Sequence, residues 1–326
     1  MLSRRHLVAH SLLLGAALSL ALAASAQTAF PSRPVRIVVP NAPGGAADLT
    51  ARAVGQKIGE ALGQPVVIDN KPGAGGVSAG DMVAKAAPDG HTLLLISSGT
   101  AVSASLFKSL PFDTVKDFIP VAPLASFDLV IVVAEGGRFK TLAELVAWGK
   151  ANPGKLNLGT PNIGTTQHLA AELFKSATGL DAQIVPFNGT PAVINALRGG
   201  QIDVGLDILS PLLSQIKAKA LHPLAITGAQ RSRMLPEVPT AKEAGVPGFA
   251  VASWNGLAVP AHTPKDVVAR LSKEITAALN DPGVKKRLED LNLDPHPGSP
   301  EQAAALLNND IKRWNDVIVR AKIPRQ

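Results

Sequence analysis

The sequence predicts an α/β fold made of two units of similar size, each a mainly parallel sheet flanked by helices. Short β-branched runs alternate with amphipathic helical segments from Val35 onward, which is typical of right-handed βαβ units. The alternation restarts after Pro123 and ends in a helical tail. The 326 residues, 46% of them hydrophobic, suffice for one large domain or for two ordinary ones.

The first unit is predicted from the order strand, helix, strand. Residues 35–39 and 65–69 form the strands, and residues 49–62 form the helix between them. Asp48 is the predicted N-cap of this helix and Gly63 is its closing residue. A second helix and a third strand follow, at 78–87 and 92–97.

The second unit repeats this order. Its predicted strands cover 129–133, 155–160, 182–187 and 201–208. Its predicted helices cover 141–152, a segment that ends at Ser176, and 188–200. Thr141 and Glu144 have the spacing of a capping box at the start of the first of these helices.

The tail consists of an extended run at 249–260 and two helices, at 263–279 and 299–321. Each of these helices has a proline at its predicted first position. The order of the segments leaves two layouts open. One crossing near residue 126 would suffice if the chain passed once from one domain to the next. Two extended crossings, at 125–134 and 249–260, would let the tail return to the first unit.

Residues 1–26 are predicted to be a signal peptide. Arg4 and Arg5 lie in a basic leader, an apolar stretch follows, and the small residues Ala24 and Ala26 precede a predicted cleavage before Gln27. The sequence therefore predicts export to the periplasm, with an uncleaved N-terminal anchor as the alternative. The paired arginines leave the general and the twin-arginine export routes open. Because the chain has no cysteine, it can form neither disulfides nor a lipoprotein-type attachment.

The composition argues against a nucleic-acid-binding protein and against most enzymes. The net charge of +7 is spread along the chain, without a cluster of Lys and Arg interleaved with aromatic residues. There is no P-loop, dinucleotide fingerprint or Gly-x-Ser-x-Gly motif, so we expect no cofactor. A secreted enzyme that acts on a carboxylate through Asp48 or His168 remains the rival, although no nucleophile or paired base accompanies them. Solitary histidines predict no metal site: His91, His168, His222, His262 and His296.

The stretch "NAPGGAADLTARAVG", from Asn41 to Gly55, opens a glycine loop directly into a helix. Free backbone N–H groups and the positive end of the helix dipole favour an anion there. Asp48 would repel a phosphate, so a smaller carboxylate, or a ligand that carries a donor, fits better. Open α/β sheets bind ligands at such loops, although plain helix caps have the same composition. Three further loops at strand ends are equally polar and uncharged: 97–100, 159–169 and 186–193.

The mature chain resembles the Bug family, the periplasmic solute-binding proteins of tripartite tricarboxylate transporters. The resemblance rests on "FPSRPVRIVVP", "APGGAAD", "GQPVVIDNKPGAGG", "AAPDGHTLLL", "FDTVKDFIPVA", "PFNGTPAVINALRGGQID", "RSRMLPEVPTAKEAG" and "WNGLAVPAHTP" in this order. It implies a two-domain Venus-flytrap fold of the type II binding-protein kind, with two crossover strands. Domain I would comprise residues 27–126 and 253–326, and domain II residues 127–252.

The resemblance also implies a non-enzymatic function. The ligand would be a small mono-, di- or tricarboxylate, and the partners would be membrane transporter subunits, or a sensor kinase if the protein is an orphan sensing component. The protein is expected to be a monomer. Two positions depart from the family pattern: Phe30 replaces a common tyrosine, and Asn41 replaces an apolar or aromatic residue.

The ligand contacts implied by the resemblance come from both domains. The first domain would supply Gly44, Gly45, Ala46, Ala47, Asp48, Ser97, Ser98 and Thr100. The second would supply Thr160, Gly164, Thr165, Thr166, His168, Asn188, Gly189, Thr190 and Asp207.

Overall fold

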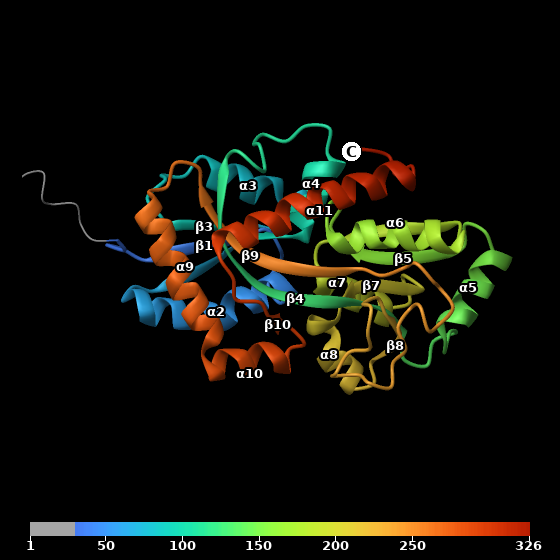
Figure 1. Cartoon of the computed structure of the whole chain (residues 1–326). Helices are drawn as coiled ribbons and strands as arrows, with labels where there is room; N and C mark the ends of the chain where they lie inside the picture. The colour runs from blue at the N-terminus through green and yellow to red at the C-terminus, as the bar shows by residue number, and fades with distance from the viewer. Residues whose placement is uncertain (1–29) are drawn as a thin grey trace, which may run out of the picture.

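The structure is a computed structural model that describes residues 30–326, so the predicted signal peptide lies outside the described residues. Strands and helices alternate along most of the chain (Figure 1). The strands are β1 (Val35–Val39), β2 (Val66–Asn70), β3 (Thr92–Ser97), β4 (Phe118–Ala134), β5 (Leu156–Pro161), β6 (Ala182–Phe187), β7 (Val204–Ile208), β8 (Leu221–Ile226), β9 (Ala252–Pro260) and β10 (Asp294–Pro295). The helices are α2 (Ala46–Leu62), α3 (Val77–Ala84), α4 (Ser98–Leu106), α5 (Leu142–Ala151), α6 (Thr166–Thr178), α7 (Thr190–Arg198), α8 (Leu209–Lys217), α9 (Lys265–Asn280), α10 (Pro282–Asp290) and α11 (Pro300–Arg320), with a 3₁₀ turn at Ala74–Gly76.

Two parallel groups of strands are joined by two antiparallel strands in the order β2-β1-β3-β9-β4-β7-β5-β6. β1 pairs in parallel with β2 and β3, and β5 pairs in parallel with β6 and β7. β3 meets β9, and β7 meets β4, in antiparallel register. The predicted α/β fold, with mainly parallel sheets in two halves, is confirmed.

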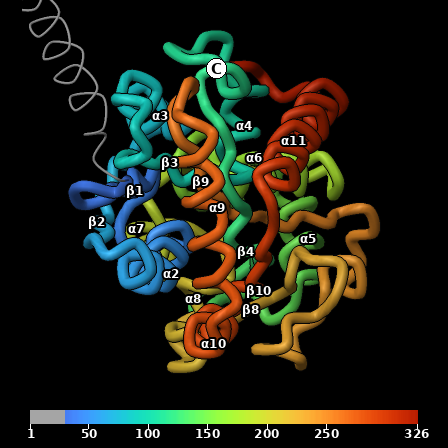
Figure 2. The backbone as a smooth tube through the Cα atoms, turned by 60° about the vertical axis from the view of Figure 1, so that its left-hand side comes forward, coloured from blue at the N-terminus to red at the C-terminus, as the bar shows by residue number. Residues whose placement is uncertain are grey.

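β4 and β9 are the two crossing strands, and they run side by side between the halves (Figure 2). Their pairing extends from Phe118 opposite Pro260 to Asp128 opposite Ala252. The second part of β4 then pairs with β7 and β8 in the other half. The layout with two crossings is therefore the one that the chain adopts.

The C-terminal helices return to the first half of the chain. α9 packs against α2, and α11 packs against α4 and β4. Trp314 of α11 is fully buried, and its Nε1–H donates to the Ser98 hydroxyl at 2.9 Å. Thus the C-terminal helices share one core with the first half.

Several local predictions about helix ends are wrong in detail. α2 begins at Ala46 with Gly45 as its N-cap, so Asp48 is a residue of the first turn. Pro264 is the N-cap of α9, outside the helix, whereas Pro300 does occupy the first position of α11. α4, predicted only as a loop at 97–100, is a helix.

The predicted capping box at α5 is only half formed. The Thr141 hydroxyl accepts from the Glu144 N–H at 3.2 Å, as expected. The Glu144 carboxylate accepts from the N–H of Lys140 at 2.8 Å instead of returning to Thr141. The N-cap is Thr141, as predicted, and only the reciprocal bond of the motif is missing.

Candidate functional site

A cavity of about 50 Å³ lies between the two halves at the carboxyl ends of their strands. The first half lines it with Asn41, Ala42, Gly45, Ala46, Ala47, Ser97 and Gly99. The crossing strands add Phe127, Ser253 and Asn255. The second half adds Pro161, Asn162, Thr165, Thr166, Gln167, Gly189, Thr190 and Ile208. The lining is a mixture of polar and apolar residues, and it contains no Lys, Arg, Asp, Glu or His.

Two helices that begin at this cavity, α2 and α7, lack a side-chain cap. Their N-caps are Gly45 and Gly189, neither of which has a side chain to accept the first N–H groups. The N–H groups in the first turn of a helix have no partner within the helix, and the positive end of the dipole lies there. In α2, on the first half, the N–H groups of Ala46 and Ala47 have no hydrogen-bond partner. In α7, on the second half, only the Thr190 N–H is free, because Pro191 has no N–H and the Ala192 N–H donates to the Gly189 carbonyl at 3.2 Å. Both halves therefore offer unpaired N–H groups to an anion in the cavity, and α2 offers more of them.

The loops before these two helices approach each other closely. Gly189 has φ of +89°, and a β-carbon built there would lie 2.7 Å from the Ala42 β-carbon. Two independent features therefore require glycine at position 189: the positive φ and the lack of space for a β-carbon. This contact closes one side of the cavity.

The helices α4 and α6, which also begin at the cavity, are capped by their own side chains. The Ser97 hydroxyl accepts from the Gly99 N–H at 3.1 Å, and the Thr100 hydroxyl accepts from the Ser97 N–H at 3.0 Å. The Thr165 hydroxyl accepts from the His168 N–H at 3.2 Å. These two loops present hydroxyl groups to the cavity.

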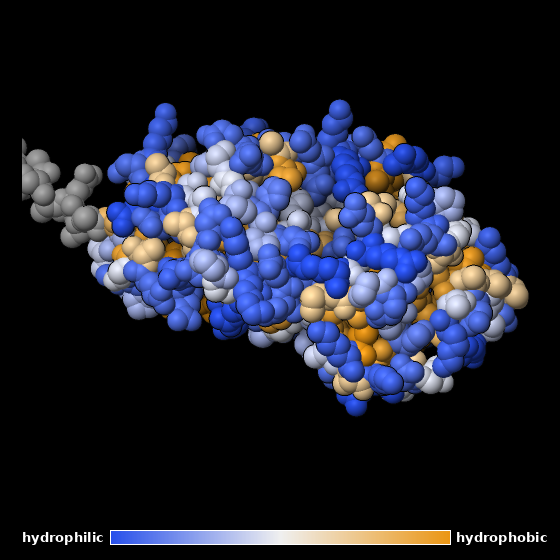
Figure 3. All heavy atoms as spheres, turned by 60° about the horizontal axis from the view of Figure 1, so that its bottom comes forward, coloured by the Kyte–Doolittle hydropathy of each residue, from blue (hydrophilic) through white to orange (hydrophobic). Residues whose placement is uncertain are grey.

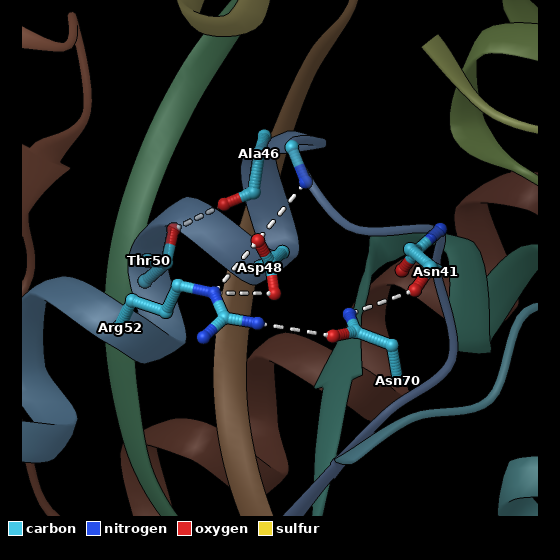
Figure 4. A network of polar contacts seen from close by, with 7 residues as sticks. Asn41, Ala46, Asp48, Thr50, Arg52 and Asn70 are labelled. Atoms are coloured by element: carbon cyan, nitrogen blue, oxygen red, sulfur yellow. Dashed lines mark hydrogen bonds and ion pairs between the residues drawn. The ribbon is translucent and has the colours of Figure 1, made fainter. Parts of the chain in front are cut away.

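Asp48 lies behind the loop and does not line the cavity. Its carboxylate accepts from the Gly44 N–H at 2.9 Å and from Arg52 Nε at 3.0 Å. The Arg52 guanidinium also donates to the Asn70 side-chain oxygen. The Asn70 amide in turn donates to the Asn41 carbonyl at 3.0 Å (Figure 4). Burial raises the pKa of Asp48, but the hydrogen bonds from Arg52 and Gly44 outweigh burial and hold the pKa below its ordinary value. Asp48 thus fixes the shape of the glycine loop.

Replacing Asp48 with asparagine should lower the free energy of unfolding by about 1–3 kcal/mol at pH 7, because it weakens a buried charge-assisted network. The folded pKa lies below the unfolded value of about 4, so this contribution is present at neutral pH and is lost as the pH falls below about 4. Urea denaturation at pH 7 and pH 3.5 measures both effects. Asp69→Asn is the matched control, because the Asp69 side chain is 22% exposed, against 4% for Asp48, and its ion pairs with Arg36 and Lys71 should contribute less than about 1 kcal/mol. Equal losses in the two variants would contradict this role.

His168 is buried behind the cavity lining. Burial lowers the pKa of its imidazole to about 4, so the side chain is neutral at neutral pH, and its Nδ1 has no hydrogen-bond partner. It therefore offers no positive charge to an anion.

Eight of the predicted site residues line the cavity, and nine do not. Those that line it are Gly45, Ala46, Ala47, Ser97, Thr165, Thr166, Gly189 and Thr190. Asp48 and His168 are buried behind the loops, Gly44 and Asn188 are exposed, and Thr160 and Asp207 are fully buried. The Ser98 hydroxyl accepts from Trp314, and Thr100 and Gly164 line an adjoining cavity of about 30 Å³.

The polar residues that sequence reasoning missed come chiefly from β9 and α6. Asn255 of β9 donates to the Thr50 hydroxyl at 2.9 Å, and Ser253 lies 3.3 Å from the Thr166 hydroxyl. Gln167 lines the cavity and donates to Asp207 at 3.0 Å. The stretch "WNG" within the family resemblance was the available signal for Asn255.

Direct contacts between the halves show that they are closed on each other. The Gly75 N–H donates to the Ile163 carbonyl at 2.8 Å, and the Ser103 hydroxyl donates to the Gly164 carbonyl at 3.1 Å. Residues 73–76 and 98–106 belong to the first half, and residues 162–165 to the second.

Larger hollows lie on the outside of the molecule. One, of about 690 Å³, runs along α2 and β2, and another, of about 630 Å³, lies beside α5, α8 and β8. Apolar side chains gather on the second half in the view of Figure 3. None of the predicted site residues lines either hollow.

Among residues 30–326 no group of three or more His, Cys, Asp or Glu side chains could hold a metal ion. Within the same described range, no helix combines the length and the apolar character needed to cross a membrane.

Two α/β halves, joined by two crossing strands and closed over a polar, uncharged cavity, define a two-domain binding protein of the Venus-flytrap kind. The chain belongs to the family described as "Tripartite tricarboxylate transporter family receptor", whose model matches residues 50–323.

Named relatives agree with this assignment. The chain is 35% identical over 292 residues to Protein BugT of Bordetella pertussis, a match that covers 89% of each protein. It is similar to the structure of MatC from Rhodopseudomonas palustris with bound malate, with a TM-score of 0.84, 36% identity and coverage of 89% of this chain and 100% of MatC. It is also similar to R. palustris Rpa4515 with adipate, with a TM-score of 0.87, 32% identity and coverage of 90% and 99%. The predicted membership of the Bug family is confirmed.

Proposed function

We propose that this protein captures a small carboxylate-bearing organic acid in the cavity between its halves and delivers it to the membrane subunits of a tripartite tricarboxylate-type transporter. The observation that carries the proposal is the pair of helix starts without a side-chain cap. α2 offers the N–H groups of Ala46 and Ala47, and α7 offers that of Thr190, to one cavity from opposite halves. The ligand's carboxylate would be held by these N–H groups and by the hydroxyls of Ser97 and Thr166, whereas the Thr165 hydroxyl already donates to the Asn162 carbonyl at 2.8 Å.

The absence of a charged side chain from the cavity lining supports a carboxylate over a phosphate. A carboxylate needs only a few donors, and uncapped helix ends supply them without a cation. MatC and Rpa4515 were solved with malate and adipate, which belong to the same chemical class. We propose this class for the present chain, and we propose that it works in the periplasm after removal of residues 1–26.

Thermal denaturation in the presence of succinate, malate, adipate and citrate tests the proposal. At a concentration of about 100 Kd, a true ligand stabilises the folded protein by about 2.7 kcal/mol, so the Tm should rise by several degrees. The diamide of succinate and inorganic phosphate are the controls, since the diamide lacks the carboxylate charge and phosphate carries a comparable negative charge on a tetrahedral group. Failure of every acid to raise the Tm more than these controls would overturn the proposal.

A further inference from the structure

Asp207 lies at the end of β7, directly beneath the candidate binding cavity. Its side chain is completely buried. Its contacts are Gln167 at the start of α6, Thr190 at the start of α7 and Ile208, and all three line the cavity. The carboxyl group is thus separated from the cavity by a single layer of side chains.

The carboxyl group of Asp207 has neutral partners only. Its Oδ1 accepts from Gln167 Nε2 at 3.0 Å and from the Ile208 N–H at 2.7 Å. Its Oδ2 is buried without a well-formed hydrogen bond, although the Thr190 hydroxyl is near enough to stabilise the charge. An acid in this position carries its negative charge with little compensation.

No cation on the elements packed against β7 pairs with Asp207. On α6 the adjacent titratable residue, His168, is neutral, and Glu172 and Lys175 pair with each other. On β4 the nearest acid is Asp128, whose charged neighbour is Asp294. β5 has no titratable residue, and the cations of α7 and α8, Arg198 and Lys217, lie in the last turns of these helices.

Entry of an anion would place a second negative charge above this carboxyl group. Two carboxylates in one poorly solvated site repel each other, and protonation of one removes the repulsion. Under the proposed function the ligand's carboxylate is held by N–H groups at the starts of α2 and α7, so the proton goes to Oδ2 of Asp207, the oxygen without a well-formed hydrogen bond. A protonated Oδ2 of Asp207 can also donate to the Thr190 hydroxyl, which leaves the proton of Thr190 free for the ligand.

We propose that Asp207 takes up one proton from solvent when the carboxylate ligand binds, so that ligand affinity depends on pH. This inference rests on the proposed function. The proton ends on Oδ2 of Asp207, and no bond of the ligand is made or broken. Desolvation by burial raises the pKa of Asp207 in the free protein to about 6, despite the hydrogen bonds from Gln167, Thr190 and Ile208. Between pH 6 and pH 8 the free protein is therefore mainly ionised at Asp207, whereas the complex is protonated there.

Titration calorimetry with malate, adipate and succinate at pH 7.5, in buffers of different ionisation enthalpy, counts the protons taken up. The carboxyls of these probes are ionised at that pH, so the probes contribute no proton. We expect the wild type to take up close to one proton and its Kd to rise by up to tenfold between pH 7 and pH 8.

Asp207→Asn replaces the acid with a neutral group of the same shape and should show no proton uptake and a flat Kd over this range. Asp128→Asn is the matched control: it removes a partly buried acid whose pKa desolvation also raises to about 6, and it should leave the uptake unchanged. Binding by the wild type without proton uptake, or uptake that persists in Asp207→Asn, would overturn this inference alone. Absence of any binding would overturn it together with the proposed function. The wild-type count is decisive even if Asp207→Asn folds poorly.

Discussion

Gly164→Ala is expected to weaken carboxylate binding by at least about 30-fold, which corresponds to about 2 kcal/mol. Gly164 has φ of +80°, and a β-carbon there would lie 2.7 Å from the Gly75 α-carbon and 2.7 Å from the Phe107 ring. The contact atom of Gly75 is a backbone α-carbon of the first half, so it cannot move aside as the end of a flexible side chain could. The clash exists only while the halves are closed, so the substitution should favour the open form and reduce affinity for any ligand that needs closure.

Gly179→Ala is the matched control for this experiment. Gly179 lies on the same half with φ of +69°, and nothing lies within 4 Å of a β-carbon built there. Both variants therefore incur the same backbone cost, about 1–2 kcal/mol of folding stability, but only Gly164→Ala obstructs closure. Calorimetry gives the affinities, and small-angle scattering with and without malate reports closure. Equal Kd values for the two variants would show that the contact between Gly164 and Gly75 does not control closure.

The repeating elements and the location of the site were predictable because they depend on local patterns. β1 was predicted residue for residue, since five apolar-rich residues are bounded by prolines. The loops at Gly45, Thr165 and Gly189 were predicted because each joins a strand to a helix through residues that free the backbone amides. Such loops gather at one edge of a parallel sheet whatever the rest of the chain does.

The rest of the site depends on contacts between distant parts of the chain, which periodicity does not record. Ser253 and Asn255 reach the cavity only because β9 crosses between β3 and β4. The sequence predicts Asp48 as a helix cap, yet Arg52 and the Gly44 N–H both donate to its carboxylate, and Gly45 is the N-cap of α2 instead. The burial of Asp207 likewise follows from the packing of α6 and α7 over β7.

Trp314→Ala should lower the free energy of unfolding by about 3–5 kcal/mol, the largest stability loss that we expect from a single substitution in this chain. Trp314 is completely buried between α11 and α4, and Arg313 stacks over its ring with the guanidinium 5.2 Å from the centroid. Removal of the indole leaves a cavity in the core that joins the C-terminal helix to the first half. It also leaves the buried Ser98 hydroxyl without its donor, which adds about 1 kcal/mol.

Trp314→Phe separates these two contributions, because it keeps most of the ring volume and removes only the N–H donor. We expect it to cost about 1–2 kcal/mol, well below the alanine variant. Urea denaturation of both variants measures the difference. Ser98 is the first residue of α4, and the hydroxyl-capped start of α4 lines the cavity. The two variants should therefore also differ in how strongly malate stabilises them against urea. A loss below about 1 kcal/mol in the free energy of unfolding of Trp314→Ala would mean that the packing of α11 contributes little to the stability of the first half.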